Sequence, residues 1–245
     1  PILRNTPNLC MRYAPLSWLA EFIFPTFCCG CNRRPGVVIC SSCSKHLAPY
    51  NKQTCFWCKE ETPLGIIHQS CRLSNEPILR GIFSIFWYAG MAGRIVRNAK
   101  YRFHNPTAIQ ELCQYIPLSH RFDLLTLQHH IKAQAITYIP LSRDAIRKRG
   151  FNQSEHIARQ VGSIMNLPVR ALLSKTTETP NQASKGRAAR MQLYNNVFHA
   201  SSRGVTSVYL VDDVVTSGAT LKEAAKVLKK AGIGKVWGVT LAHGN

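Results

Sequence analysis

The sequence predicts an α/β fold, with a mainly parallel β-sheet preceded by a small metal-binding module. Nine of the ten cysteines lie before residue 72, most of them in CxxC pairs. After residue 76, short stretches rich in β-branched and aromatic residues alternate with amphipathic stretches. Strands that alternate with helices are typical of a parallel sheet. We therefore expect a module at residues 1–75 and a larger domain at residues 76–245.

The cysteine pairs predict structural zinc. A CxxC turn brings two thiolates within reach of one ion, and two such turns complete a tetrahedral site with no open position for catalysis. The candidate ligands are Cys28, Cys31, Cys40, Cys43, Cys55, Cys58, His68 and Cys71. They can serve two ions, held by successive or by interleaved pairs, or a single ion. Disulfides are the competing interpretation, which a cytoplasmic setting disfavours.

Eight elements are expected in the larger domain. They are a strand at 81–89, helices at 91–103 and 105–118, a strand at 133–140, a helix at 152–165, a strand at 207–213, a helix at 218–232 and a strand at 235–242. The first strand is rich in aromatic and β-branched residues. The helix after it carries Ile95, Val96 and Ala99 on one face. Asn152 and Glu155 suggest a capping box at the start of the helix at 152–165.

The helix at 218–232 is the most regular of these elements. Leu221, Ala224, Ala225 and Leu228 follow the i, i+3, i+4, i+7 spacing of one buried face. Gly232 is placed to end the helix, and lysines occupy its last turn. The preceding strand, this helix and the final strand therefore predict a βαβ unit.

The charge of the chain points to an anionic partner. With 31 Lys and Arg against 12 Asp and Glu, the formal net charge is +19. Residues 76–204 carry 18 basic and 6 acidic side chains, so +12 of the excess lies in the middle of the chain. A polyanionic partner is the favoured interpretation, and a solvated basic surface is the alternative.

Targeting signals are not expected. No signal-peptide pattern is present at the start of the sequence. No apolar run reaches the roughly 20 residues that a membrane-spanning helix requires. These observations favour a cytoplasmic protein without a membrane span.

The segment VYLVDDVVTSGAT, at 208–220, predicts a ligand site. Ligands of open parallel sheets bind beyond the carboxyl ends of the strands, where Asp212 and Asp213 are expected. The turn of Thr216, Ser217, Gly218, Ala219 and Thr220 opens the next helix, whose free N–H groups favour a phosphate. The two carboxylates can accept hydrogen bonds from a diol or bind magnesium. The pattern favours a phosphorylated sugar over a simple helix cap.

This segment resembles the phosphoribosyl-pyrophosphate signature of type I phosphoribosyltransferases. The chain as a whole is similar to the ComF family of competence-associated proteins. That resemblance rests on the paired cysteines and on NAKYRFHN at 98–105, IPLSRDAIRKRGFNQSEHIA at 139–158 and NQASKGRAARMQLYNNVF at 181–198. His68 is a departure, since the family usually has a cysteine there. The resemblance implies a sheet of the phosphoribosyltransferase type.

The resemblance also implies roles for individual residues. Asp212 and Asp213 would contact the ribose hydroxyls or Mg²⁺, and the turn at 216–220 would hold the 5-phosphate. The segment after Pro140 would handle pyrophosphate, and residues 174–196 would form a lid. The implied cationic contacts for pyrophosphate or DNA phosphates are Arg143, Arg147, Lys148, Arg149, Lys185, Arg187 and Arg190.

In function, the resemblance implies a role in natural transformation. Single-stranded DNA would be handled in the cytoplasm, with a helicase-like partner and recruitment to the inner face of the membrane. Cations beside aromatic rings suit this ligand, because they combine stacking with neutralisation of the backbone. The candidate DNA contacts are Arg94, Arg97, Lys100, Tyr101 and Arg102. The alternative is an active phosphoribosyltransferase in nucleotide salvage or metabolism, and the sequence leaves catalysis and its acceptor open.

Overall fold

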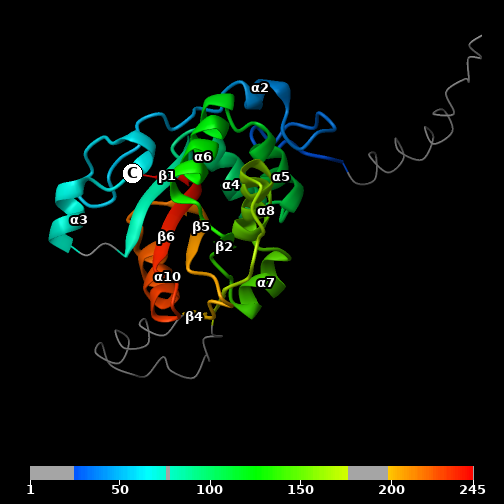
Figure 1. Cartoon of the computed structure of the whole chain (residues 1–245). Helices are drawn as coiled ribbons and strands as arrows, with labels where there is room; N and C mark the ends of the chain where they lie inside the picture. Colours follow the sequence, from blue (N-terminus) through cyan, green and yellow to red (C-terminus); the bar gives the residue numbers. More distant parts are fainter. Residues whose placement is uncertain (1–24, 76–77, 176–197, 245) are drawn as a thin grey trace, which may run out of the picture.

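The centre of the molecule is a four-stranded parallel sheet (Figure 1). The computed structural model describes residues 25–75, 78–175 and 198–244. The strand order is β1-β6-β5-β2. The strands are β1 (Leu79–Trp87), β6 (Lys235–His243), β5 (Ser207–Val215) and β2 (Ala135–Tyr138). The predicted mainly parallel α/β fold is confirmed.

Helices cover both faces of this sheet (Figure 1). One core contains buried residues of four helices and of one sheet face, and the other contains those of α10 and the opposite face. The four helices are α4 (Met91–Tyr101), α5 (Pro106–Gln114), α6 (Leu118–Ile131) and α8 (Gln153–Met165), and α10 spans Ala219–Lys230. Short elements complete the described chain: α2 (Ser41–Ser44), η1 (Pro63–Gly65), α3 (Gln69–Asn75), α7 (Arg143–Arg149), and the antiparallel pair β3 (Leu173–Lys175) and β4 (Phe198–Ala200).

The predicted helical face of α10 is confirmed, since Leu221, Ala224, Ala225 and Leu228 are all buried. At α8, the Asn152 side chain accepts a hydrogen bond from the Ser154 N–H at 3.0 Å. The Glu155 carboxylate instead pairs with Arg159 on the helix surface, at 2.7 Å. Only the first half of the predicted capping box therefore forms.

Helix α6 was not expected from the sequence. It buries His120, Leu124 and Leu127, while Leu118 and Phe122 are 74% and 68% exposed. Apolar residues thus lie on both its buried and its exposed sides. The sequence therefore lacks the alternation of apolar and polar residues, with a period of 3.6, that identifies an amphipathic helix. Within the described ranges, no helix has the length and hydropathy needed to cross a membrane.

The cysteine-rich segment protects the edge of the sheet. β1 is an edge strand, and residues 48–67 run beside it in the opposite direction. The Tyr50 N–H donates to the Ile85 carbonyl at 2.9 Å, and the Gln53 side chain exchanges two hydrogen bonds with the Ser84 backbone. Unpaired strand edges invite association with other chains, so this cover has a physical purpose. The division of the chain at residue 76 stays a prediction.

Candidate functional site

The structure groups the eight predicted metal ligands into two sets. Cys28, Cys31, Cys40 and Cys43 form the first, and Cys55, Cys58, His68 and Cys71 form the second. Within each set the ligand atoms lie within 4.8 Å of one another. Successive pairs therefore share a site, and the interleaved arrangement is excluded. No disulfide joins the described cysteines, so the disulfide interpretation is wrong for them.

Both sets fit a tetrahedral ion. The sulfur atoms of Cys31 and Cys40 are 3.8 Å apart, and Cys58 Sγ lies 3.2 Å from His68 Nδ1. A tetrahedral zinc site with bonds of about 2.3 Å to sulfur has edges of about 3.8 Å. Burial opposes ionisation of Cys28, but N–H groups of Cys40, Cys31 and Gly30 outweigh it and lower its pKa to about 7. The thiolate form that a metal requires is thus favoured at this position.

The acid pair lies near the carboxyl end of β5, which continues to Val215 beyond the expected end at 213. Asp212 Oδ1 accepts hydrogen bonds from the Ser154 hydroxyl at 3.0 Å and from the Asp213 N–H at 2.8 Å. The Asp213 carboxylate forms an ion pair with the Lys100 ammonium group. Both partners of this pair are largely buried, with side chains 12% and 13% exposed. Asp212 is therefore fixed by hydrogen bonds, whereas Asp213 is neutralised by the charge of Lys100.

Two segments distant in sequence converge on these acids. NAKYRFHN supplies Lys100 from α4, and RGFNQS supplies Ser154 from α8. The neighbouring Asn152 donates to the Ile139 carbonyl at 3.0 Å, which ties the start of α8 to the end of β2. Neither Ser154 nor the Lys100–Asp213 pair was expected from the sequence. Their only advance signal was membership of the two segments that carry the family resemblance.

The surroundings of Asp212 favour its neutral form. Burial, and next the charge of Asp213, raise its pKa to about 7. Hydrogen bonds from the Asp213 N–H and from Ser154, and the charge of Lys100, partly offset this rise. A carboxyl group poised near neutrality can accept hydrogen bonds as an anion or donate one as an acid.

The predicted phosphate turn leads directly into α10. Thr216, Ser217, Ala219 and Thr220 are exposed, and Gly218 adopts a left-handed conformation with φ 72°. Among the hydrogen bonds of the described residues, the N–H groups of Thr216, Ser217 and Gly218 have no acceptor, and that of Ala219 faces Ser217 Oγ at 3.4 Å. The turn therefore keeps donors that an anion can use.

The second metal set lies against this turn, which the sequence did not predict. Phe56, inside the Cys55–Cys58 loop, contacts Gly218 so closely that a Cβ there would collide with its ring. The adjacent Trp57 ring has the Lys222 ammonium 5.0 Å from its centroid. The Cys55–Cys58 loop is thus packed on the first turn of α10.

The remaining predicted residues are divided between α4, α7 and a segment that lies outside the described residues. Arg94, Arg97 and Tyr101 are exposed on α4, and Arg102 is exposed directly after its last residue. The Arg149 guanidinium group lies 5.2 Å from the centroid of the Tyr101 ring, so α4 and α7 meet here. Arg143, Arg147 and Lys148 are exposed on α7, whereas Lys185, Arg187 and Arg190 lie outside the described residues, as does the expected lid.

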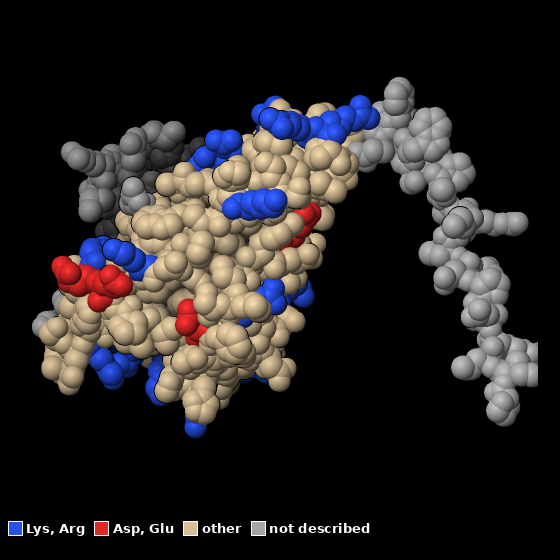
Figure 2. Space-filling view, turned by 90° about the horizontal axis from the view of Figure 1, so that it is seen from above, with Lys and Arg blue, Asp and Glu red and all other residues tan. Residues whose placement is uncertain are grey.

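Lys and Arg do not form one continuous stripe on the face shown in Figure 2, where they lie in several separate groups. Lys100 does not contribute to such a surface, because it is largely buried against Asp213. Arg143 lines an open cavity of about 460 Å³ together with Asn152 and Lys175. Neither Asp212 nor Asp213 lines that cavity.

Comparison with known proteins identifies relatives that match most of the chain. A scan against models of protein families finds no match. Competence protein F of Haemophilus influenzae is 28% identical over 215 residues, which cover 83% of this chain and 90% of that protein. Competence protein ComFC of Streptococcus pneumoniae is 29% identical, over 81% of this chain and 78% of that protein. ComFC of Bacillus subtilis is 23% identical, over 89% and 85% respectively.

Among solved structures, glutamine phosphoribosylpyrophosphate amidotransferase from B. subtilis, complexed with ADP and GMP, aligns at 20% identity and a TM-score of 0.36. The alignment covers 56% of this chain and 26% of that chain. The three curated relatives, by contrast, each match at least 81% of this chain. Over most of its length, the chain is therefore similar to curated competence proteins of the F and ComFC type.

Proposed function

We propose that this chain acts in natural transformation, in the cytoplasmic handling of single-stranded DNA, through a pocket for a phosphorylated ribose. The observation that carries the proposal is the acid pair of β5 followed by the open turn at 216–220, in a chain whose relatives are named competence proteins. A turn with free N–H groups suits a phosphate, and neighbouring carboxyl groups suit hydroxyls.

In this pocket, the turn at 216–220 would hold the 5-phosphate of phosphoribosyl pyrophosphate. Asp213 and Asp212 would bind the ribose hydroxyls or Mg²⁺, which neutralises developing charge when pyrophosphate leaves. Lys100 would balance the charge of the acid pair while the pocket is empty. Zinc in the two cysteine-rich sets would be structural, and it would keep Phe56 in place against Gly218.

Calorimetric titration of phosphoribosyl pyrophosphate with Mg²⁺ tests the pocket. We expect binding by the parent chain and its loss in the double variant Asp212→Asn with Asp213→Asn, which should keep the native circular dichroism spectrum at a lower stability because Lys100 loses its partner. Asp123→Asn, on α6, is the matched control and should bind as the parent does. Loss of the fold in the double variant, or undiminished binding, would assign the acids a structural role.

A second measurement separates a binding protein from an enzyme. The parent chain, supplied with phosphoribosyl pyrophosphate, Mg²⁺ and a panel of nucleobases and amines, is assayed for release of pyrophosphate. Release with an acceptor would favour the alternative of metabolic phosphoribosyl transfer. Ligand binding without release supports a sensor or scaffold.

For DNA, the proposed surface joins the exposed residues of α4 to those of α7. The contact between Tyr101 and Arg149 connects the two helices, and Tyr101 is 66% exposed. An exposed ring beside cations can stack on a base while the cations neutralise phosphates. The family resemblance adds a helicase-like partner at the inner face of the membrane, which co-purification from competent cells would test.

Fluorescence anisotropy with an oligothymidylate tests this surface. The logarithm of the affinity should fall with that of salt by about 0.7 per neutralised phosphate, or about 3.5 for five contacts. Tyr101→Ala should cost about 1–3 kcal/mol of binding, the usual value for one stacked base. Tyr115→Ala, which removes another exposed tyrosine, should cost little. An affinity that does not depend on salt would contradict DNA binding.

A further inference from the structure

A second cavity lies at the amino ends of the parallel strands, whereas the acid pair lies near their carboxyl ends. Its volume is about 240 Å³, and it opens where the strands begin, beside Arg80 of β1, Val208 of β5 and Lys235 of β6. Val208 and Asp212 are four residues apart on β5, or about 13 Å at about 3.3 Å per residue. The cavity is therefore distinct from the proposed ribose pocket.

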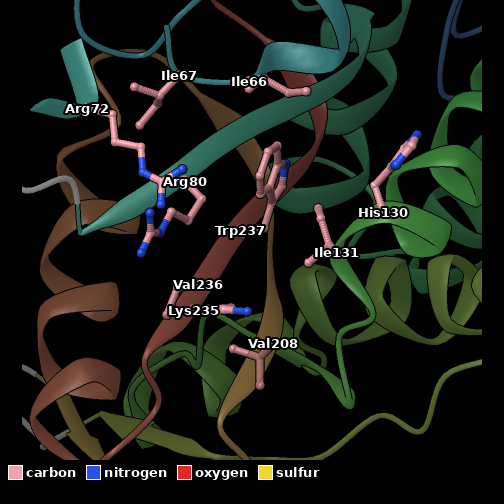
Figure 3. Close-up of a pocket in the computed structure, with 10 residues that line it drawn as sticks. All are labelled: Ile66, Ile67, Arg72, Arg80, His130, Ile131, Val208, Lys235, Val236 and Trp237. Atoms are coloured by element: carbon pink, nitrogen blue, oxygen red, sulfur yellow. The ribbon is translucent and has the colours of Figure 1, made fainter. Parts of the chain in front are cut away.

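Positive charge is concentrated in this cavity (Figure 3). Arg72 comes from α3 in the cysteine-rich segment, and its guanidinium group lies beside that of Arg80. Across the residues that the structure describes, no ion pair involves Arg72, Arg80 or Lys235. Burial and the charge of Arg72 lower the pKa of Arg80. Two adjacent guanidinium groups that have no counter-charge among the described residues form a fork that matches the oxygens of a phosphate.

Trp237 supplies a second, independent feature. Its side chain lies in the middle of the cavity, with the arginines on one side and Ile131 on the other (Figure 3). Only 7% of the residue is exposed, and its Nε1–H has no hydrogen-bond partner. Buried polar groups without a partner are uncommon, because leaving one unpaired costs about 1–3 kcal/mol. A ligand that offers an acceptor to this N–H would remove that cost.

The size of the cavity restricts the ligand. The volume of about 240 Å³ is just below the roughly 300–1,000 Å³ that is usual for drug-sized ligands, and the cavity is open to solvent, so a ligand of nucleotide size would be only partly enclosed. The walls between the charged groups are apolar, from Ile66, Ile131 and Val236. The cavity thus combines a place for an anion with a place for a flat or apolar group.

We propose that this cavity is a binding site for a small phosphorylated ligand of the nucleoside monophosphate class. Its phosphate lies between Arg72 and Arg80, and its ring lies against the apolar wall, where an acceptor atom takes the hydrogen bond of Trp237. Because Arg72 follows Cys71 directly, the second metal set positions half of the phosphate fork. The site goes beyond the proposed function and does not depend on it.

Calorimetric titration of adenosine monophosphate and thymidine monophosphate tests the proposal. The full chain carries Asp212→Asn with Asp213→Asn, so that the ribose pocket does not contribute. We expect binding that falls about 10- to 100-fold when Arg72→Gln and Arg80→Gln are added, the usual effect of losing charged hydrogen bonds. Trp237→Phe should weaken nucleotide binding about 2- to 10-fold and leave binding of inorganic phosphate unchanged. If the acid variant does not fold, the arginine substitutions are compared in the parent chain, where they should remove the same fraction of nucleotide binding.

The control is Lys229→Gln with Lys230→Gln, which removes the same charge from the exposed end of α10. An equal loss in this control would reduce the effect to net charge and overturn the proposal. Adenosine that binds as tightly as its monophosphate would overturn the role of the arginines. The proposal would also be overturned if the parent chain did not bind either nucleotide. The same holds if the arginine variant lost its binding of oligothymidylate but kept its binding of the nucleotides.

Discussion

Replacement of Lys100 by methionine is the most direct test of how the acid pair is stabilised. Methionine keeps most of the apolar stem of lysine and removes the ammonium group. Lys100 and Asp213 are 12% and 13% exposed, and Asp212 is the adjacent residue. Without Lys100, two neighbouring carboxyl groups therefore stay in a largely buried site with no cation among their described contacts.

Removing one partner of a buried ion pair typically costs about 3–5 kcal/mol, because a buried charge stays uncompensated. At about 3 kcal/mol per molar urea, this lowers the midpoint of unfolding by about 1–1.7 M. The cost depends on pH. Burial and Asp213 already raise the pKa of Asp212 to about 7, so its neutral form is favoured in the folded protein. Its contribution to stability is present in acid and is lost as the pH rises towards 7.

Urea unfolding followed by far-UV circular dichroism measures the effect. We expect the loss of stability in Lys100→Met to be larger at pH 8 than at pH 5, because at pH 5 the carboxyl group of Asp212, whose pKa is raised to about 7, is protonated. Asp213→Asn in the same chain should restore much of the stability at pH 8. Lys226→Met is the control, because Lys226 and Glu223 pair at 40% and 41% exposure and such pairs contribute about 0–1 kcal/mol. Equal effects of the two lysine variants would refute the reasoning.

Three further predictions concern the turn, the metal sets and the core. Gly218→Ala should lower stability in thermal unfolding by more than the roughly 1–2 kcal/mol of a left-handed alanine, because its Cβ meets Phe56; an unchanged midpoint would contradict this contact. Cys58→Ser and Cys43→Ser should each reduce the zinc content, measured by mass spectrometry, from two ions to one per chain, and the buried Cys43 should cost more stability. A content of two in either variant would count against that ligand set. Leu228→Ala should cost about 2–5 kcal/mol in urea unfolding, since the side chain is fully buried, and a cost below that range would mean that the core of α10 adapts.

Much of the fold could be predicted from local patterns. The apolar residues of α10 recur at i, i+3, i+4 and i+7, a spacing that places side chains on one face only in a helix. The residues with this spacing are the ones that the structure buries. The CxxC pairs predicted metal ligands because the two sulfurs of each pair are neighbours in the chain. Helix α6 could not be found in this way, because Leu118 and Phe122 carry its apolar character onto the exposed side.

Local chemistry in the chain accounts for the strand, the acid pair, the turn at 216–220 and the candidate metal ligands, since each lies within a few consecutive residues. The pairing of Lys100 with Asp213, the hydrogen bond from Ser154 to Asp212 and the packing of Phe56 on Gly218 join residues that are 58 to 162 positions apart. Such contacts depend on how the helices pack against the sheet. For that reason the tertiary structure, and not the local sequence pattern, determines which charged groups pair and which pairs of cysteines lie close enough to share an ion.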